Sequence, residues 1–241
     1  MKNALSIKEL PNDILVQILD LLDHPSQLQM CLTSKAISRS CIKVMWRIPR
    51  CTKATTFKAL MSTVDNSNSN YYPYSIYMIG LSISFSSVQT LHYDSPISPI
   101  PLKLIRLENV LELSIALVDK ILCNNLQQIH LSKCAFNSVN TFLDAFMHHG
   151  PYDKLEKITI DDSHMSDQLI CQMITMAPDL RHLNYSQSGF ISDKTVDIIV
   201  QHCPLLETFV ATLPRPIIQA NTVTFTSLEK LAQLKHLKIF V

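Results

Sequence analysis

The stretch LEKITIDDSHMSDQLICQMITMAPDLRHLNY, residues 155–185, holds the pattern that decides the fold. It begins with an L-x-x-I-x-I run from Leu155 to Ile160 and ends with an L-x-x-L-x-Y run from Leu180 to Tyr185. Side chains alternate along a strand, so each run predicts a short strand with one apolar face. Between the runs, apolar residues recur at the spacing of one helix face: Leu169, Ile170, Met173 and Ile174. The predicted unit is one strand followed by one helix.

The same unit recurs along the chain. Its strand runs start at six leucines that are 24, 29, 25, 26 and 28 residues apart: Leu102, Leu126, Leu155, Leu180, Leu206 and Leu234. A weaker run, Met78-Leu81-Ile83, starts 24 residues before the first. Such steps are typical of leucine-rich repeats, whose period is roughly 20 to 29 residues. The pattern predicts an α/β fold, a curved solenoid with parallel strands on its concave side and helices on its convex side.

Two details of the repeats are visible in the sequence. The pairs Ser166-Asp167 and Ser192-Asp193 occupy equivalent places before two predicted helices, where Ser or Asp can cap a helix. Cys203-Pro204 with Leu206 and Phe209 resembles the cysteine-containing subtype of leucine-rich repeat. The Asn or Cys that usually follows the strand is kept mainly at Cys134.

Residues between and just after the strand leucines should point out of the concave sheet, because side chains alternate. These form the candidate target-binding face: Arg106, Glu108, Gln128, His130, Lys157, Thr159, Asp161, His182, Asn184, Ser186, Thr208, Val210, Thr212, His236 and Lys238. The face is polar and rich in histidine. Any such sheet must show polar side chains to water, so the pattern predicts a surface and only suggests a binding site.

The N-terminal stretch LPNDILVQILDLLDHPSQLQMCLTSKAISRSCIKVMW, residues 10–46, has a different organisation. After Pro11, apolar residues recur on one helix face; they are Ile14, Leu15, Ile18, Leu19 and Leu22. A second short helix around Leu28 and a third ending before Pro49 follow. Fewer than about 40 to 60 residues seldom bury enough surface to be stable alone. This unit is therefore expected to pack on a partner, on the rest of the chain, or on both.

The same stretch resembles an F-box, in the form common in fungal proteins. The resemblance rests on L-P-x-D-I-L-x-x-I-L-x-x-L at residues 10–22, Leu28, the L-x-S-K run at 32–35, and Trp46 followed by Arg47-x-Pro49. It covers about a fifth of the chain. One position departs from the family pattern, because Ile37 stands where the family usually has an aromatic residue. The predicted organisation is an F-box over 5–50, a linking helix and polar loop over 51–75, and leucine-rich repeats over 76–241.

The resemblance implies a substrate-recognition subunit of an SCF-type (cullin-RING) ubiquitin ligase. In that family the F-box binds a Skp-type adaptor and through it a cullin, while the repeats hold a target protein. Carried onto this chain, the adaptor contacts are Leu10, Pro11, Ile14, Leu15, Ile18, Leu28, Leu32 and Lys35. No residue is implied in catalysis, and no cofactor or metal is expected. The alternative is a scaffold or protein-binding module that acts outside ubiquitylation.

Charge is unevenly divided along the chain. The net charge is +1, but residues 1–60 carry nine basic and four acidic residues. Four of the basic residues recur every fourth position and form a basic stripe on the predicted third helix: Lys35, Arg39, Lys43 and Arg47. The stripe is either a solvated helix face or a contact for an acidic protein. A nucleic-acid partner is not expected, because the stripe has no interleaved aromatics and the pI is near 7.6.

Composition argues against several other classes. With only three glycines there is no phosphate-cradling loop. His148-His149 and the Asp161-Asp162-His164 group are read more simply as a polar helix end and a solvated turn than as metal or acid–base sites. Seven cysteines without paired C-x-x-C spacing predict free thiols in a reducing compartment.

The location and regulation of the chain are also predicted. The chain shows no signal-peptide core and no apolar run of membrane-spanning length, which predicts a cytoplasmic or nuclear protein without a membrane partner. The Ser-Pro steps at Ser95 and Ser98 are either phosphorylation sites or part of a rigid connection.

Overall fold

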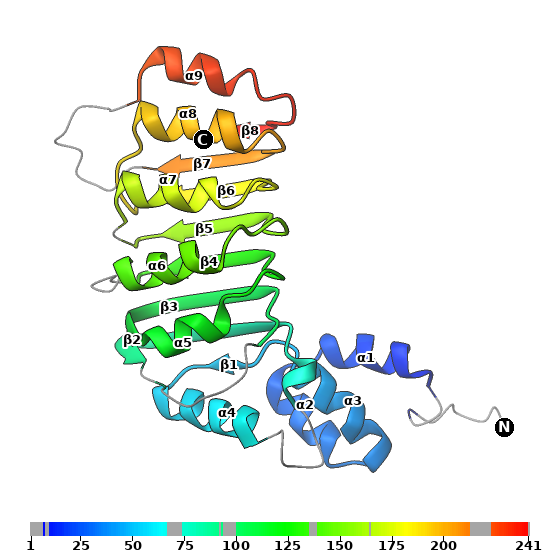
Figure 1. Cartoon of the computed structure of the whole chain (residues 1–241). Helices are drawn as coiled ribbons and strands as arrows, with labels where there is room; N and C mark the ends of the chain where they lie inside the picture. Colours follow the sequence, from blue (N-terminus) through cyan, green and yellow to red (C-terminus); the bar gives the residue numbers. More distant parts are fainter. Residues whose placement is uncertain are drawn as a thin grey trace.

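The computed structural model describes residues 7, 10–66, 74–91, 93, 100–134, 139–163, 165–212 and 223–240. Its centre is one sheet in which the described strands lie in chain order and every neighbouring pair is parallel (Figure 1). The strands are β1 (Arg50–Cys51), β2 (Gly80–Leu91), β3 (Leu104–Leu113), β4 (Gln128–Ser132), β5 (Lys157–Asp161), β6 (His182–Ser186), β7 (Thr208–Thr212) and β8 (Ile239–Phe240). Sequential parallel pairing requires a crossover after each strand.

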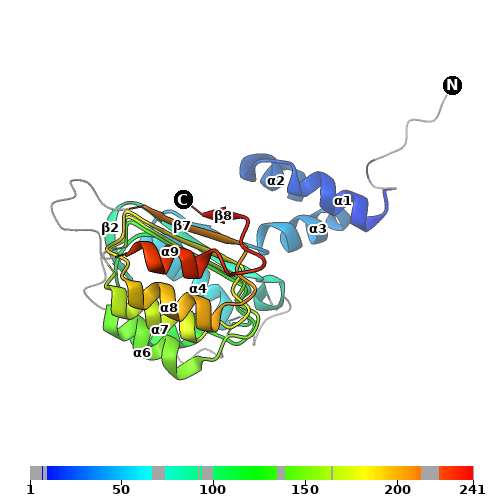
Figure 2. The same cartoon turned by 90° about the horizontal axis from the view of Figure 1, so that it is seen from above.

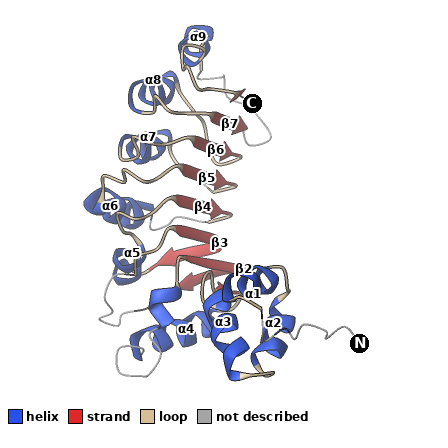
Figure 3. Ribbon diagram, turned by 90° about the vertical axis from the view of Figure 1, so that its right-hand side faces the viewer, coloured by secondary structure: helices blue, strands red, loops and turns tan. Residues whose placement is uncertain are grey.

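Helices supply most of these crossovers and gather on one face of the sheet (Figures 2 and 3). They are α4 (Ala54–Asn66), α5 (Ile115–Ile121), α6 (Val139–His149), α7 (Asp167–Thr175), α8 (Asp193–His202) and α9 (Phe225–Leu231). The short 3-10 helix η2 (Tyr74–Tyr77) precedes β2. The opposite face of the sheet, which these helices leave uncovered, is called the open face below.

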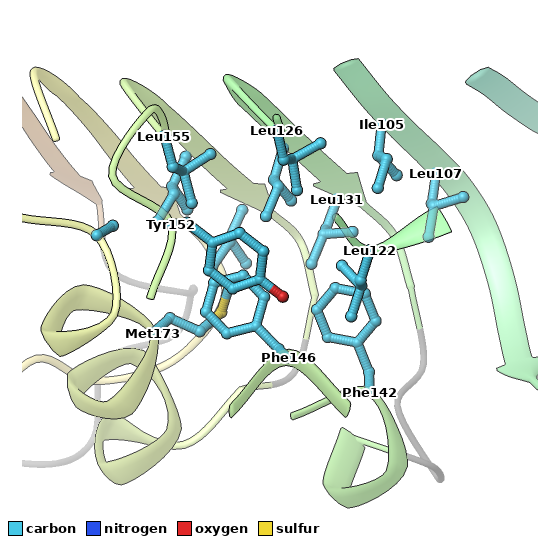
Figure 4. Close-up of a cluster of buried hydrophobic side chains, with 14 of the residues drawn as sticks. Ile105, Leu107, Leu122, Leu126, Leu131, Phe142, Phe146, Tyr152, Leu155 and Met173 are labelled. Atoms are coloured by element: carbon cyan, nitrogen blue, oxygen red, sulfur yellow. The ribbon is translucent and has the colours of Figure 1, made fainter. Parts of the chain in front are cut away.

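The core lies between the sheet and these helices. The inward strand positions are apolar in successive repeats, as the leucine pattern predicts: Leu81, Ile105, Ile129, Ile158, Leu183 and Phe209 form one row. Figure 4 shows the aromatic part of this core, where Phe146 stacks on Tyr152 with ring centroids 4.3 Å apart. Burial of this continuous row joins the repeats into one body.

A residue with left-handed backbone follows three successive strands, and another lies within β3 just after its pairing with β4 ends. Asn109, Lys133, Asp162 and Gln187 all have φ between 46° and 56°. In three of these repeats the side chain of the next residue donates a hydrogen bond to the backbone carbonyl two positions earlier. The pairs are Cys134 to Ser132, Ser163 to Asp161, and Ser188 to Ser186. Sequence reasoning found this position only at Cys134. The hydroxyls of Ser163 and Ser188 make the same turn as Cys134. Each also accepts the N–H of the equivalent residue one repeat earlier: Ser163 from Cys134, and Ser188 from Ser163.

The N-terminal helical unit consists of α1 (Asn12–Asp20), α2 (His24–Cys31) and α3 (Lys35–Met45), as the sequence predicts. Side-chain caps begin two of the helices, because Asp23 accepts from Ser26 N and Ser34 from Ile37 N. The unit has a small core of its own, formed by Leu15, Leu19, Ile37 and Cys41. Ile37, which departs from the family pattern, is 1% exposed and fills this core.

The helical unit lies beside the β1 end of the sheet (Figure 1). Trp46, directly after α3, stacks on Tyr74 with ring centroids 4.4 Å apart and packs against the main core. The carbonyl of Arg47 accepts from Ile79 N and Gly80 N, and that of Pro49 from Ser82 N. The unit is thus joined to the sheet by continuous backbone pairing.

The body differs from the sequence prediction at its start. Residues 51–75 are predicted as a linking helix and a polar loop. The helix is present as α4, and most of the predicted loop lies outside the described residues, but Arg50–Cys51 pairs with β2 as the first strand. Phe57, Met61 and Val64 of α4 lie in the main core. The first strand-and-helix unit therefore begins inside the predicted end of the F-box. A two-residue strand has too few residues to show alternation, so the sequence pattern could not reveal it.

The last repeat differs in register. The sequence pattern aligns Leu234 with Leu206, which would place His236 and Lys238 on the open face. In the structure Thr208 pairs with Ile239, so Leu237 is the equivalent of Leu206. The prediction for His236 and Lys238 is wrong for this reason: His236 lies before β8, and Lys238 takes the place of Glu207, whose carbonyl accepts its N–H. Both leucines fit the apolar pattern, so the pattern could not choose between them.

Candidate functional site

Exposed apolar side chains are concentrated on the N-terminal helical unit. Among the described residues, nine large apolar side chains are exposed, and five of them lie between residues 7 and 32: Ile7, Ile14, Leu21, Leu28 and Leu32. Leu28 of α2 and Leu32, directly after that helix, are 46% and 81% exposed and stand about one helical turn apart. An apolar surface concentrated in this way is typical of a protein–protein contact.

The predicted adaptor contacts divide into surface and core. Pro11, Ile14, Leu28, Leu32 and Lys35 are exposed, and Leu10 and Ile18 are half-buried. Leu15 is 6% exposed and packs inside the small core. It can support the adaptor surface only by holding the helices together.

Sequence reasoning missed Leu21, which is 86% exposed at the end of α1. Leu21 follows Ile14 by seven residues, which places the two side chains on the same side of the helix. That spacing was a usable signal in the sequence. Leu21 therefore extends the apolar side of α1 that carries Ile14.

The basic stripe is a solvent-facing row on α3. Lys35, Arg39, Lys43 and Arg47 are all exposed. Arg47 forms an ion pair with Asp20 of α1 at 3.2 Å, which leaves both side chains at least 40% exposed. Such an exposed pair contributes little to stability, about 0 to 1 kcal/mol. The stripe remains available to solvent or to an acidic protein.

The open face holds a hollow of about 390 Å³ over β3 to β7. It contains most of the predicted target-binding residues: Arg106, Gln128, His130, Lys157, Thr159, His182, Asn184 and Thr208 line it, together with Val210. The strand pairing places these residues in two rows, because Gln128, Lys157, His182 and Thr208 are in register, as are Arg106, His130, Thr159 and Asn184. The predicted residues Glu108 and Asp161 share a third row that does not line the hollow.

His130 lies among the charged groups of the hollow and its third row. Burial lowers the pKa of His130 below its usual range, and the charges of Arg106 and Lys157 lower it further, against the opposing effect of Asp161 and Glu108. The imidazole of His130 is therefore mostly neutral near pH 7. His182 Nδ1 lies 3.2 Å from the Thr208 hydroxyl.

A charged ladder runs along the edge of the sheet just before the strands. Glu207 bridges two neighbouring repeats, because its carboxylate accepts from Arg181 at 2.9 Å and from Lys238 at 2.8 Å. These two hydrogen bonds lower the pKa of Glu207 to about 2. Sequence reasoning missed this contact because it depends on the register of the last repeat.

The described residues include some of the histidines and acidic residues that the sequence singles out. No group of three His, Cys, Asp or Glu side chains is placed to hold a metal within them. His149 lies at the end of α6 and contacts Asp119 at 3.1 Å. His164, Ser95 and Ser98 lie outside the described residues. None of the described helices combines the length and hydropathy needed to span a membrane.

All seven cysteines are free thiols, as predicted. Five of them are buried, and burial raises the pKa of Cys51 and Cys134 to about 11 and that of Cys203 to about 12. A thiol with so high a pKa is a poor nucleophile at neutral pH. These cysteines act as small core residues.

Comparison with known protein families gives one match, which coincides with the N-terminal helical unit. Residues 7–45 match the model of the F-box domain. A comparison of the chain with curated proteins finds no match. The matched range covers α1, α2 and α3 and ends one residue before the Trp46 junction. The chain therefore carries an F-box domain, set at one end of a parallel sheet built from repeated strand-and-helix units.

Proposed function

We propose that this chain is a substrate-recognition subunit of an SCF-type ubiquitin ligase. F-box domains in general bind Skp-type adaptors, and residues 7–45 match that domain. The observation that carries the proposal is the row of exposed apolar residues inside this match, with Leu28 and Leu32 on or directly after α2 and Ile14 and Leu21 on or directly after α1. Such side chains favour burial against a partner by about 25 cal/mol per Å² of apolar surface removed from water.

The small core of the helical unit supports the same proposal. Four buried side chains hold α1 and α3 together, and α2 contributes no fully buried residue. A unit with so little core gains stability when a partner binds its folded form, by mass action. The adaptor would therefore stabilise the F-box as well as attach it to a cullin.

We further propose that the stacked units are leucine-rich repeats and that their open face holds a target protein. The role of the chain would be positional. Holding a target near the ubiquitin-charged enzyme converts a bimolecular encounter into an effectively intramolecular one, which raises the local concentration of the reacting groups. This role requires no bond-making residue in this chain and corresponds to a protein of the cytoplasm or nucleus.

The adaptor contact can be tested with variants of the exposed residues. Leu28→Asp with Leu32→Asp places two charges in the apolar surface and should abolish co-purification with a Skp-type adaptor. Leu15→Asp would be a poor choice, because a charge in the small core would unfold the unit.

A matched control applies the same change to two exposed apolar residues elsewhere. Ile115 and Phe225 are 62% and 76% exposed on α5 and α9. Ile115→Asp with Phe225→Asp should keep adaptor binding, and both double variants should unfold thermally like the parent chain. Undiminished adaptor binding by the α2 variant would refute the assignment of this surface.

A ubiquitin-transfer assay distinguishes the proposed function from the alternative, a scaffold that acts outside ubiquitylation. With adaptor, cullin and charged enzyme present, a substrate-recognition subunit should promote ubiquitin transfer to a protein bound on its repeats. Stable assembly with the adaptor and target without any transfer would favour the scaffold.

A further inference from the structure

The hollow on the open face has a charge imbalance. Arg106 and Lys157 are exposed and line it, and no carboxylate does. Neither cation forms an ion pair with an acidic group among the residues that the structure describes. The hollow therefore holds two positive charges and no carboxylate among its lining residues, while Glu108 and Asp161 lie in the next row along the strands.

Some cations outside the hollow are paired with carboxylates. Arg181 and Lys238, on the neighbouring edge of the same sheet, share the carboxylate of Glu207. Lys230 pairs with Asp197 on the helical side. Other exposed cations, among them Lys58 and Lys235, also form no ion pair within the described residues, so what distinguishes Arg106 and Lys157 is that they line one hollow together.

The geometry of the hollow suits an extended acidic chain. Arg106 lies on β3 and Lys157 on β5, with β4 between them, and Lys157 stands two residues earlier in register, so their backbones are about 12 Å apart. Same-side side chains of an extended peptide repeat every 7 Å or so, which the length and flexibility of Arg and Lys can match. Gln128 and Asn184 add polar groups around the two cations.

The third row sets a direction for such a chain. Glu108, within β3, and Asp161, at the carboxyl end of β5, follow the hollow along the strands and would repel acidic groups there. Ser84 already donates to Glu108 at 2.6 Å. Acidic groups of a bound chain are thus favoured over the first two rows and disfavoured over the third. This selects both the sign of the bound charge and the position of the chain along the strands.

We propose that the hollow between Arg106 and Lys157 recognises a segment of the target protein that carries anionic side chains, carboxylates or phosphates, in extended form. This inference rests on the proposed target-binding role of the repeats and names the chemistry of the target. The field of the two cations already reaches the side chain between them, since it contributes to the lowered pKa of His130.

Fluorescence anisotropy with the full chain tests this directly. Three labelled twelve-residue peptides share one scaffold and carry Glu, phosphoserine or Gln at alternate positions. The Glu or phosphoserine peptide should bind about tenfold or more tightly than the Gln peptide at low salt, and less so as salt rises. Tighter binding of the phosphoserine peptide than of the Glu peptide would identify phosphate as the recognised anion.

Two double variants locate the binding. Arg106→Gln with Lys157→Gln should lose the preference for anionic peptides. Lys58→Gln with Lys235→Gln removes the same charge from exposed positions outside the hollow and should keep it. Equal binding of all three peptides, or a preference that survives in the first double variant, would overturn the proposal. The proposal would also be overturned if a labelled oligonucleotide bound the parent chain more tightly than the peptides do and Arg106→Gln with Lys157→Gln abolished that binding.

The adaptor assay keeps this inference separate from the proposed function. Arg106→Gln with Lys157→Gln leaves the F-box residues unchanged and should co-purify with the adaptor as the parent chain does. If the parent chain binds the adaptor but shows no preference for anionic peptides, only the inference about the target is removed. Lost adaptor binding in the parent chain would remove the proposed function.

Discussion

The carboxylate of Asp167 on α7 accepts two hydrogen bonds from Ser192, the residue that begins α8. Ser192 N lies 2.9 Å from Oδ1, and Ser192 Oγ lies 2.6 Å from Oδ2. Thr195 of α8 also donates its hydroxyl to Asp167. Asp193 repeats the arrangement one unit later, accepting from Thr224 N at 2.7 Å at the start of α9. Each aspartate therefore caps the helix of the next repeat.

Removing this cap should loosen the contact between two repeats. Asp167→Ala leaves the N–H and hydroxyl of Ser192 and the hydroxyl of Thr195 without their acceptor and should lower the free energy of unfolding by about 1 to 2 kcal/mol. Asp167→Asn keeps one acceptor oxygen and should lose less. Urea unfolding followed by circular dichroism gives these values, with Asp179→Ala, at an exposed turn position, as control. A loss no larger than that of the control would show that the cap is not significant.

Gly189 stands where no side chain fits. Its φ is 158°, and a Cβ there would lie 2.5 Å from the carbonyl oxygen of Met165 and 2.6 Å from the hydroxyl of Tyr185. Gly189→Ala should therefore destabilise the chain by about 1 to 3 kcal/mol, measured by urea unfolding.

A double variant tests the cause of this loss. Tyr185→Phe removes the hydroxyl, which donates to Met165 O at 2.6 Å, and with it one of the two close contacts. Combined with Gly189→Ala, it should cost less than the sum of the two single changes. Strict additivity would mean that the hydroxyl does not contribute to the strain.

The junction of the F-box with the sheet can be followed by fluorescence, because Trp46 is the only tryptophan. Tyr74→Ala removes its stacking partner and should shift the emission of Trp46 to longer wavelength, since the indole becomes more exposed to water. The free energy of unfolding should fall by about 0.5 to 1.5 kcal/mol in addition to the loss that comes from burying less apolar area. Tyr77→Ala, the other tyrosine of η2, is the control. An unchanged spectrum in Tyr74→Ala would contradict the stacked geometry.

The ladder Arg181–Glu207–Lys238 predicts a specific acid dependence. The folded state lowers the pKa of Glu207 from 4.5 to about 2, mainly through Lys238 and Arg181. Its contribution to stability is fully present above pH 4.5 and is lost as the pH falls toward 2. The difference in melting temperature between the parent chain and Glu207→Gln should therefore be largest above pH 5 or so and shrink below it.

A second variant controls for net charge in that experiment. Glu229→Gln removes the same charge from an exposed position of α9 that forms no ion pair within the described chain. Above about pH 5, the decrease in melting temperature caused by Glu207→Gln should exceed that caused by Glu229→Gln. A difference that stays constant from pH 2 to 7 would show that the ladder does not set the titration of Glu207.

Local patterns predicted a large part of the fold. The alternation in Leu155–Ile160 and the helical spacing around Leu169 to Ile174 identified strands and helices because both periods are properties of a short chain segment. The F-box helices were found in the same way. Residue types also placed most of the open-face residues, since Arg106, His130 and Lys157 alternate with buried leucines and isoleucines.

Contacts between units could not be predicted from these patterns. The sequence predicts that Ser166 or Asp167 caps α7. In the structure Ser166 makes no side-chain cap, and the carboxylate of Asp167 accepts from Ser192 at the start of α8, because the partner depends on how neighbouring helices are set side by side. Leu15 and Ile14 look equivalent in sequence, and only the packing of α1 on α3 buries the first and exposes the second.

The sequence by itself determined the repeating strand-and-helix unit and the F-box, because both are written in residue spacing. Tertiary structure decided the start of the sheet at Arg50–Cys51, the register that puts Leu237 rather than Leu234 in line with Leu206, and the charge of the hollow. The reason is physical. Spacing along one chain fixes which face of an element is apolar, whereas register and charge balance arise from pairing between elements far apart in the chain.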